Sequence, residues 1–95
     1  MENLELENVA RYFAQKYHND HLIHAVVEFD DESKHLTAQY LFDREPEDED
    51  VDDCEDFCGE LIGAFPDVKT ADTVCKKFDN QNMDFKSGLV VYSRR

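Results

Sequence analysis

The run from Glu47 to Asp56 holds the densest set of chemically active side chains, with eight acids in ten positions. In a helix, which rises 1.5 Å per residue, this run places about one negative charge every 1.9 Å, close to the roughly 1.7 Å spacing on duplex DNA. Such a surface fits the cationic groove of a nucleic-acid-binding protein. We therefore predict that these acids contact a basic partner: Glu47, Asp48, Glu49, Asp50, Asp52, Asp53, Asp56 and Glu60.

A simpler interpretation treats the same acids as the solvated start of a helix. Acidic side chains near a helix N-terminus are favoured by about 0.3 to 1 kcal/mol each through the helix dipole. The dipole does not require eight acids in ten positions, and their mutual repulsion costs stability. The sequence leaves both interpretations open, an interface or an acidic surface that serves solubility.

Three of these acids also suggest a calcium site, because Asp48, Asp50 and Asp52 have the first alternate spacings of an EF-hand loop. The pattern then fails. The position that requires glycine holds Asp53, and the last position, which requires glutamate, holds Gly59. We predict no specific metal site and no cofactor.

The cysteines Cys54, Cys58 and Cys75 fall within hydrophobic patterns, and their spacing matches no strong zinc signature. Because cysteine is among the most buried residue types, we expect free thiols in the core of a protein from a reducing compartment. No catalytic triad is recognisable around the histidines, which we expect on the surface: His18, His21, His24 and His35.

The composition of the chain argues against several classes of function. The chain has 95 residues and a formal net charge of -13, which repels nucleic acid and anionic membranes. Its 3 glycines form no phosphate-binding loop or dinucleotide fingerprint, so we predict a binding protein and not an enzyme. No apolar stretch approaches the roughly 20 residues of a membrane span, and no basic leader precedes an apolar run. These features predict a cytoplasmic protein.

Charge is unevenly distributed along the chain. Residues 43–67 hold twelve acids and one base, whereas residues 68–95 hold three acids and six bases. The protein therefore has an acidic middle and a mildly basic C-terminal part.

The first half of the chain predicts a helix and a hairpin. Apolar residues recur at three- and four-residue steps over residues 4–18, with Asn19 suited to a left-handed stop. Residues 22–29 and 36–42 alternate between apolar and polar side chains, and the short polar connector between them predicts antiparallel pairing.

A second helical stripe runs from Val51 to Phe65 and ends there because Pro66 disfavours helix in the residue before it. Gly59 and Gly63 within it predict a close approach to the sheet or to another helix.

The last third is less regular. Residues 68–78 fit either a helix or a strand, and we favour a strand. A turn at 79–82 and a strand over 85–92 follow, and the nearly continuous apolar run from Leu89 to Tyr92 predicts a position inside the sheet.

The predicted fold is a single α+β domain over residues 1–95. Its order is α-β-β-α-β-β, with two helices on one face of a four-stranded, mainly antiparallel sheet. The predicted core consists of Val9, Phe13, Tyr17, Val27, Phe29, Leu36, Tyr40, Leu61, Ile62, Phe65, Leu89 and Val91.

For function, we predict an acidic protein that inhibits or modulates a basic partner, such as a nuclease or another nucleic-acid-binding protein. A nucleic-acid mimic, a nuclease-immunity protein and an antirestriction factor share this mechanism. The alternative is an adaptor or assembly subunit that pairs through an open sheet edge, with the acidic run serving solubility. No direct nucleic-acid or membrane partner is expected. The oligomeric state stays open, with a homodimer among the alternatives.

Overall fold

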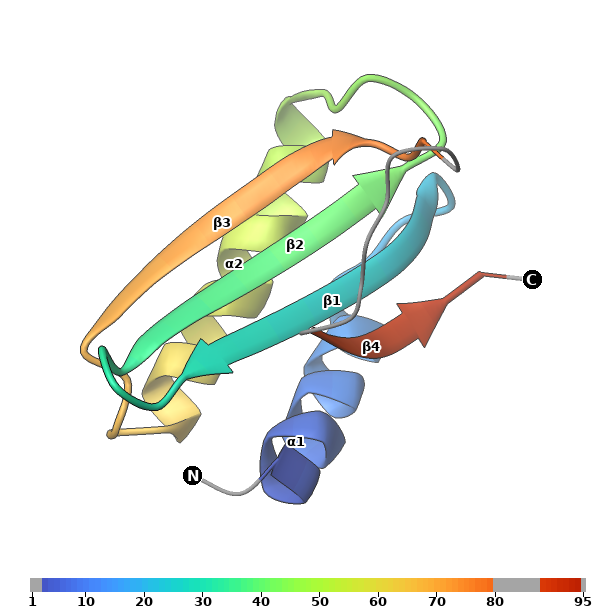
Figure 1. The fold of residues 1–95 in the computed structure, drawn as a ribbon. Helices are drawn as coiled ribbons and strands as arrows, with labels where there is room; N and C mark the ends of the chain where they lie inside the picture. Colours follow the sequence, from blue (N-terminus) through green and yellow to red (C-terminus); the bar gives the residue numbers. More distant parts are fainter. Residues whose placement is uncertain (1–2, 80–87, 95) are drawn as a thin grey trace.

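Two helices and four strands follow one another in the predicted order (Figure 1). The computed structural model describes residues 3–79 and 88–94. The elements are α1 Asn3–Lys16, β1 Leu22–Asp30, β2 His35–Phe42, α2 Asp48–Ala64, β3 Thr70–Lys77 and β4 Leu89–Ser93. Neither described helix is long and apolar enough to cross a membrane. The predicted α+β class is confirmed.

The four strands form one mixed sheet in the spatial order β3-β2-β1-β4. Strand β1 pairs antiparallel with both β2 and β4. Strands β2 and β3 run parallel, because α2 carries the chain back along the sheet before β3 begins. Both helices cover the same face of the sheet, and the hydrophobic core lies between the two layers (Figure 1).

The turn between β1 and β2 contains the one positive φ among the described non-glycine residues, 58° at Lys34. Asn19 is therefore not left-handed, and its predicted role as the stop of α1 is wrong. Its side chain is used instead in hydrogen bonds to α2.

The segment that fitted both a helix and a strand is a strand. β3 pairs with β2 in continuous register, from His35↔Thr70 to Phe42↔Lys77, without a bulge. Ala71 and Cys75 pack against the core from this strand. Pairing with β2 decides the structure, because the apolar residues of this segment fit both a helical and a strand periodicity.

Strand β4 lies at an edge of the sheet, so its predicted interior position is wrong. A register shift in its pairing with β1 gives β4 one extra residue. This bulge lets Leu89 and Tyr92 both pack against the core, with Val91 between them also buried. A continuous apolar run can therefore belong to an edge strand. Residues 80–82 of the predicted turn and 85–87 of the predicted strand lie outside the described residues.

The core contains most of the predicted residues. Those that are buried are Val27, Leu36, Tyr40, Leu61, Phe65 and Val91. Those that are half-buried against the core are Val9, Phe13, Tyr17, Phe29 and Leu89. The prediction is wrong for Ile62, which is 42% exposed because it lines an open groove between α2 and β3. It omitted several residues that are fully or nearly fully buried: Leu6, Leu22, Phe42 and Phe57.

Gly59 and Gly63 do not mark a close approach within the chain. A Cβ atom at either position would meet no atom within 4 Å, so the predicted contact with a sheet or helix is wrong. Glycine is required instead at Gly88, where a Cβ would lie 2.6 Å from Cγ1 of Val26.

Candidate functional site

The predicted acidic residues lie on α2 and on the residue before it. The apolar stripe of α2, with Cys54, Phe57, Cys58 and Leu61, is buried toward the sheet, so most acids between these residues face outward. We call the exposed acids the acidic face: Glu47, Asp48, Glu49, Asp52, Glu55, Asp56 and Glu60.

Asp50 is fully buried and does not belong to the acidic face. Arg44 donates to it twice, from Nη2 to Oδ1 at 3.0 Å and from Nε to Oδ2 at 3.1 Å. The Asn19 side-chain amide donates to Oδ1 at 2.6 Å, and the Glu47 backbone N–H donates to Oδ2 at 2.9 Å. Both carboxylate oxygens are satisfied inside the protein, so Asp50 offers no free acceptor to a partner.

This network keeps Asp50 ionised. Burial alone would raise the pKa of the Asp50 carboxyl, but hydrogen bonds from Arg44, Glu47 and Asn19 outweigh it and hold that pKa below its ordinary value. The hydrogen bond to Asp50 also raises the pKa of Arg44. The Arg44–Asp50 pair therefore fixes the loop before α2 to the first turn of α2, and the Asn19 amide fixes the segment after α1 to the same turn.

Arg44 also contacts the rim of the acidic face. Its Nη2 lies 2.9 Å from Oε1 of Glu49, and its Nη1 lies 3.4 Å from Oε2 of Glu47. The side chains of Glu49 and Glu47 remain 70% and 63% exposed, with part of their charge neutralised. Among the described residues, no cation lies within ion-pair distance of Asp48, Asp52 or Asp56.

Asp53 is half-buried and lies beside the segment that follows α1. Its Oδ2 accepts a long hydrogen bond of 3.4 Å from Asn19. Burial raises the pKa of Asp53, and the charges of Asp56 and Asp50 raise it further. Glu60 also contacts the residue that follows α1, because its Oε1 accepts a hydrogen bond from the Tyr17 hydroxyl at 3.2 Å.

The exposed charge on α2 is less dense than the sequence predicts, because Asp50 and Asp53 turn inward. Six exposed acids cover the twelve steps from Asp48 to Glu60, so a helix rising 1.5 Å per residue carries about one charge every 3 Å. That spacing is closer to the roughly 3.4 Å between phosphates along one DNA strand than to the duplex value.

Sequence reasoning missed Arg44 and Asn19. Two local signals point to the inward turn of Asp50: Arg44 is the single base within residues 43–67, and Glu47 and Asp50 have the first-to-fourth spacing of a capping box. No local signal links Asn19 to Asp50, because 31 positions separate them.

The three cysteines lie in or beside the hydrophobic core. Cys54 and Cys58 are buried and Cys75 is half-buried, and all three are free thiols. The hydrogen bond with Cys75 and burial raise the pKa of Cys54, and burial raises the pKa of Cys58. Among the described residues, no cluster of three or more His, Cys, Asp or Glu side chains could hold a metal ion.

The four histidines lie partly exposed at the surface, and each has a polar partner. Nδ1 of His21, for example, lies 2.9 Å from Oδ1 of Asp43, whose other oxygen accepts from Nη1 of Arg94 at 2.8 Å. This cluster joins the end of β2 to the residue after β4. The histidines therefore support the fold.

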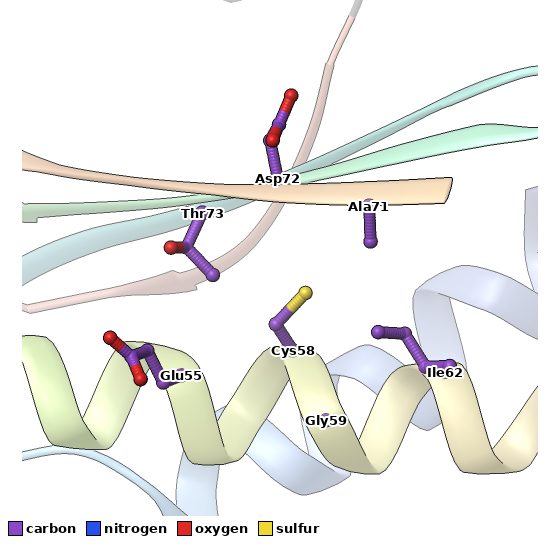
Figure 2. A pocket seen from close by; sticks show the side chains of 7 residues that line it. All are labelled: Glu55, Cys58, Gly59, Ile62, Ala71, Asp72 and Thr73. Atoms are coloured by element: carbon purple, nitrogen blue, oxygen red, sulfur yellow. The ribbon is translucent and has the colours of Figure 1, made fainter.

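An open groove lies between α2 and β3 (Figure 2). Figure 2 shows Ala71 and Thr73 pointing toward α2, whereas Asp72 points to the other face of the sheet. The helix contributes Glu55, Cys58, Gly59 and Ile62.

Comparison with known proteins places the chain in a family. Residues 7–95 match the family model described as MafI2 immunity protein. The chain belongs to the MafI2 immunity protein family. A search of curated proteins found no match. Membership of this family makes the chain an immunity-type protein, which agrees with the coarser part of the predicted function.

Proposed function

We propose that this MafI2 family member protects against a toxin by binding a basic surface of that toxin through its acidic face. Family membership supports a toxin as the partner class. The observation that carries the site is the row of exposed acids on one helix, in which Asp48, Asp52 and Asp56 have no described cation beside them. Their charge sets the sign of the complementary surface.

A nuclease, or another toxin with a cationic substrate groove, fits this surface best. Such a groove binds phosphates through Lys and Arg side chains. Carboxylates at about 3 Å intervals along a helix offer those cations acceptors at nearly the spacing of one nucleic-acid strand. The bound helix then blocks the substrate sterically and electrostatically, without any reaction.

The internal network around Asp50 supports this role through preorganisation. Arg44 and Asn19 hold the first turn of α2 before any partner binds. Less conformational entropy is then lost on association.

The test begins with the tagged chain, which captures the toxin from the source cell for identification and purification. Association is then measured with the triple variant Asp48→Asn, Asp52→Asn, Asp56→Asn. We expect slower association of this variant and a steep loss of wild-type affinity with added salt.

A matched control carries Glu5→Gln, Asp31→Asn and Glu32→Gln, which remove the same number of exposed charges outside the acidic face. We expect nearly wild-type association for this control. Equal slowing of the two triple variants would show that only net charge matters. No slowing of the acidic-face variant would place the contact elsewhere.

A second candidate keeps the immunity role and moves the contact to the outer edge of β3, which has no described strand partner. Backbone pairing would then provide the affinity, and the acidic face would serve solubility. Under this alternative, the acidic-face variant binds at an unchanged rate at both low and physiological salt.

A further inference from the structure

The outer edge of β3 is an interaction surface that the proposed toxin contact does not use. Among the described strands, β3 pairs only with β2, and in Figure 1 no strand lies along its outer side. Its register with β2 is continuous from Thr70 to Lys77, without a bulge or a proline. A regular edge that has no strand partner among the described residues is a template for another strand.

Two hydrogen bonds show which backbone groups of β3 point outward. The N–H of Thr70 donates to the carbonyl of Lys34 at 3.4 Å, and the N–H of Phe78 donates to the carbonyl of Phe42 at 2.7 Å. The even-numbered residues of β3 therefore face β2. Because bonding direction alternates along a strand, the N–H and C=O groups of the odd-numbered residues face the open edge: Ala71, Thr73, Cys75 and Lys77.

We propose that a second copy of this chain occupies the edge, by antiparallel β3–β3 pairing about a two-fold axis at Val74. In this register the outward groups of Thr73 pair with those of the partner's Cys75, and Ala71 pairs with the partner's Lys77. All outward-facing groups of β3 are then used. The two sheets become one continuous sheet.

Charge selects this register. With the axis at Val74, Asp72 lies opposite the partner's Lys76, and symmetry repeats the pair. With the axis at Thr73, neither charge has an opposite partner, and with the axis at Asp72 two like carboxylates oppose each other. The Asp72 side chain is 75% exposed although His35 Nε2 lies 3.2 Å away, so its carboxylate is available for the pair.

The groove beside β3 provides room for the partner's α2. Ile62 lines this groove from α2 (Figure 2), and its side chain is 42% exposed. Continuation of the sheet brings the partner's α2 toward the β3 side of this groove, where it covers Ile62. The partner's Lys77, opposite Ala71, enters the groove that Glu55 lines.

The charges on β3 favour a second copy over a basic toxin segment. The strand carries Asp72, Lys76 and Lys77, so it is not acidic although the chain has a net charge of -13. A basic segment would meet two lysines, whereas a second β3 brings Asp72 to each Lys76. Physiological salt screens the longer-range repulsion between the two acidic chains.

Light scattering and sedimentation of the full chain, from micromolar to millimolar concentration in physiological salt, test the proposal. We expect the mass to rise to twice that of one chain. Thr73→Pro removes an outward N–H without removing a bond to β2, so it should abolish the dimer while circular dichroism stays unchanged. A wild-type chain that stays monomeric at millimolar concentration overturns the proposal, as does a folded Thr73→Pro variant that still dimerises.

A charge exchange separates pairing from an effect on folding. Asp72→Lys or Lys76→Asp alone sets like charges opposite each other at both symmetric positions, and each should raise the dimer dissociation constant about tenfold. The double variant should restore dimerisation, and failure to restore it rules out this register. Toxin binding through Asp48, Asp52 and Asp56 should be unchanged in these variants, because the substitutions leave these three residues in place. Loss of toxin binding in Thr73→Pro would instead assign the edge to the toxin.

Discussion

Arg44 donates a hydrogen bond to each oxygen of the buried Asp50 carboxylate, at donor–acceptor distances of 3.0 and 3.1 Å, at the start of α2. This bidentate arrangement is the strong form of a charged hydrogen bond and fixes the geometry of both groups. Within the acidic run from Glu47 to Asp56, Asp50 therefore has a structural role at the helix start, whereas Asp48 and Asp52 remain exposed. The acids of this run are therefore not interchangeable.

The Asp50→Asn variant should be strongly destabilised. The change leaves Arg44 without its charge partner and weakens the bond from the Glu47 N–H. Breaking a buried ion pair typically costs about 3 to 5 kcal/mol, and we expect about 3 because Arg44 can still reach water. Urea unfolding measures the loss. Asp52→Asn, on the same helix but exposed, should change the unfolding free energy by less than about 0.5 kcal/mol. Equal effects of the two changes would contradict the anchoring role.

The Asp50 contribution should depend on pH in a defined direction. Because its folded-state pKa lies below the ordinary value, its stabilisation is present above the unfolded pKa of about 3.9 and is lost as pH falls through the folded pKa. The difference in unfolding free energy between wild type and Asp50→Asn should therefore be constant near neutral pH and shrink below about pH 4. Denaturation series at several pH values measure it. A difference that persists unchanged in strong acid would refute the assigned pKa direction.

Sequence periodicity predicted the elements well because most of them expose one face and bury the other. It failed where a contact distant in sequence decides the outcome. The bulge that turns Leu89 and Tyr92 inward arises from pairing with β1, and the apolar run alone indicates only burial. Residue spacing likewise does not show that Asn19 reaches Asp50, so the predicted acidic surface included a buried residue.

Gly59 and Ile62 on α2 also show what a sequence pattern cannot predict. The helical stripe predicted that Ile62 is buried and that Gly59 lies in a close contact. Both predictions are wrong, because a helical pattern does not show where the sheet beneath the helix ends. The sheet ends at β3, which leaves both residues beside an open groove.

Two phenylalanines that the sequence ranked equally should differ in the folded protein. Phe65 is 5% exposed, so Phe65→Ala should cost about 3 to 5 kcal/mol. Phe13 is only half-buried, so Phe13→Ala should cost about half as much, because less apolar area leaves water on folding. Thermal and urea unfolding of both variants measure the contrast. Equal losses would contradict the burial of these two side chains.

The cysteines should react with an alkylating reagent in a definite order. Hydrogen bonding with Cys54 lowers the pKa of the half-buried Cys75, while burial raises the pKa of Cys58 and contributes to the raised pKa of Cys54. Timed iodoacetamide labelling at low micromolar protein concentration, followed by peptide mass spectrometry, should modify Cys75 first. The other two thiols should react only when the protein unfolds. Native labelling of Cys58 as fast as Cys75 would be inconsistent with this order.

Loss of charge at Asp48 and at Asp56, two exposed aspartates of α2, should change the free energy of unfolding in opposite directions. Asp48 lies in the first turn, where the helix dipole favours a negative charge, so Asp48→Asn should cost about 0.3 to 1 kcal/mol, less the repulsion from Asp52 that it relieves. Asp56 is beyond the first turn and has acids four residues away on both sides, Asp52 and Glu60. Asp56→Asn should therefore stabilise the fold by a few tenths of a kcal/mol. Unfolding measured at low and high salt tests both signs, because salt should shrink both differences. Destabilisation by Asp56→Asn that salt leaves unchanged would mean that this carboxylate makes a specific contact within the chain, and its repulsion would not be the dominant effect.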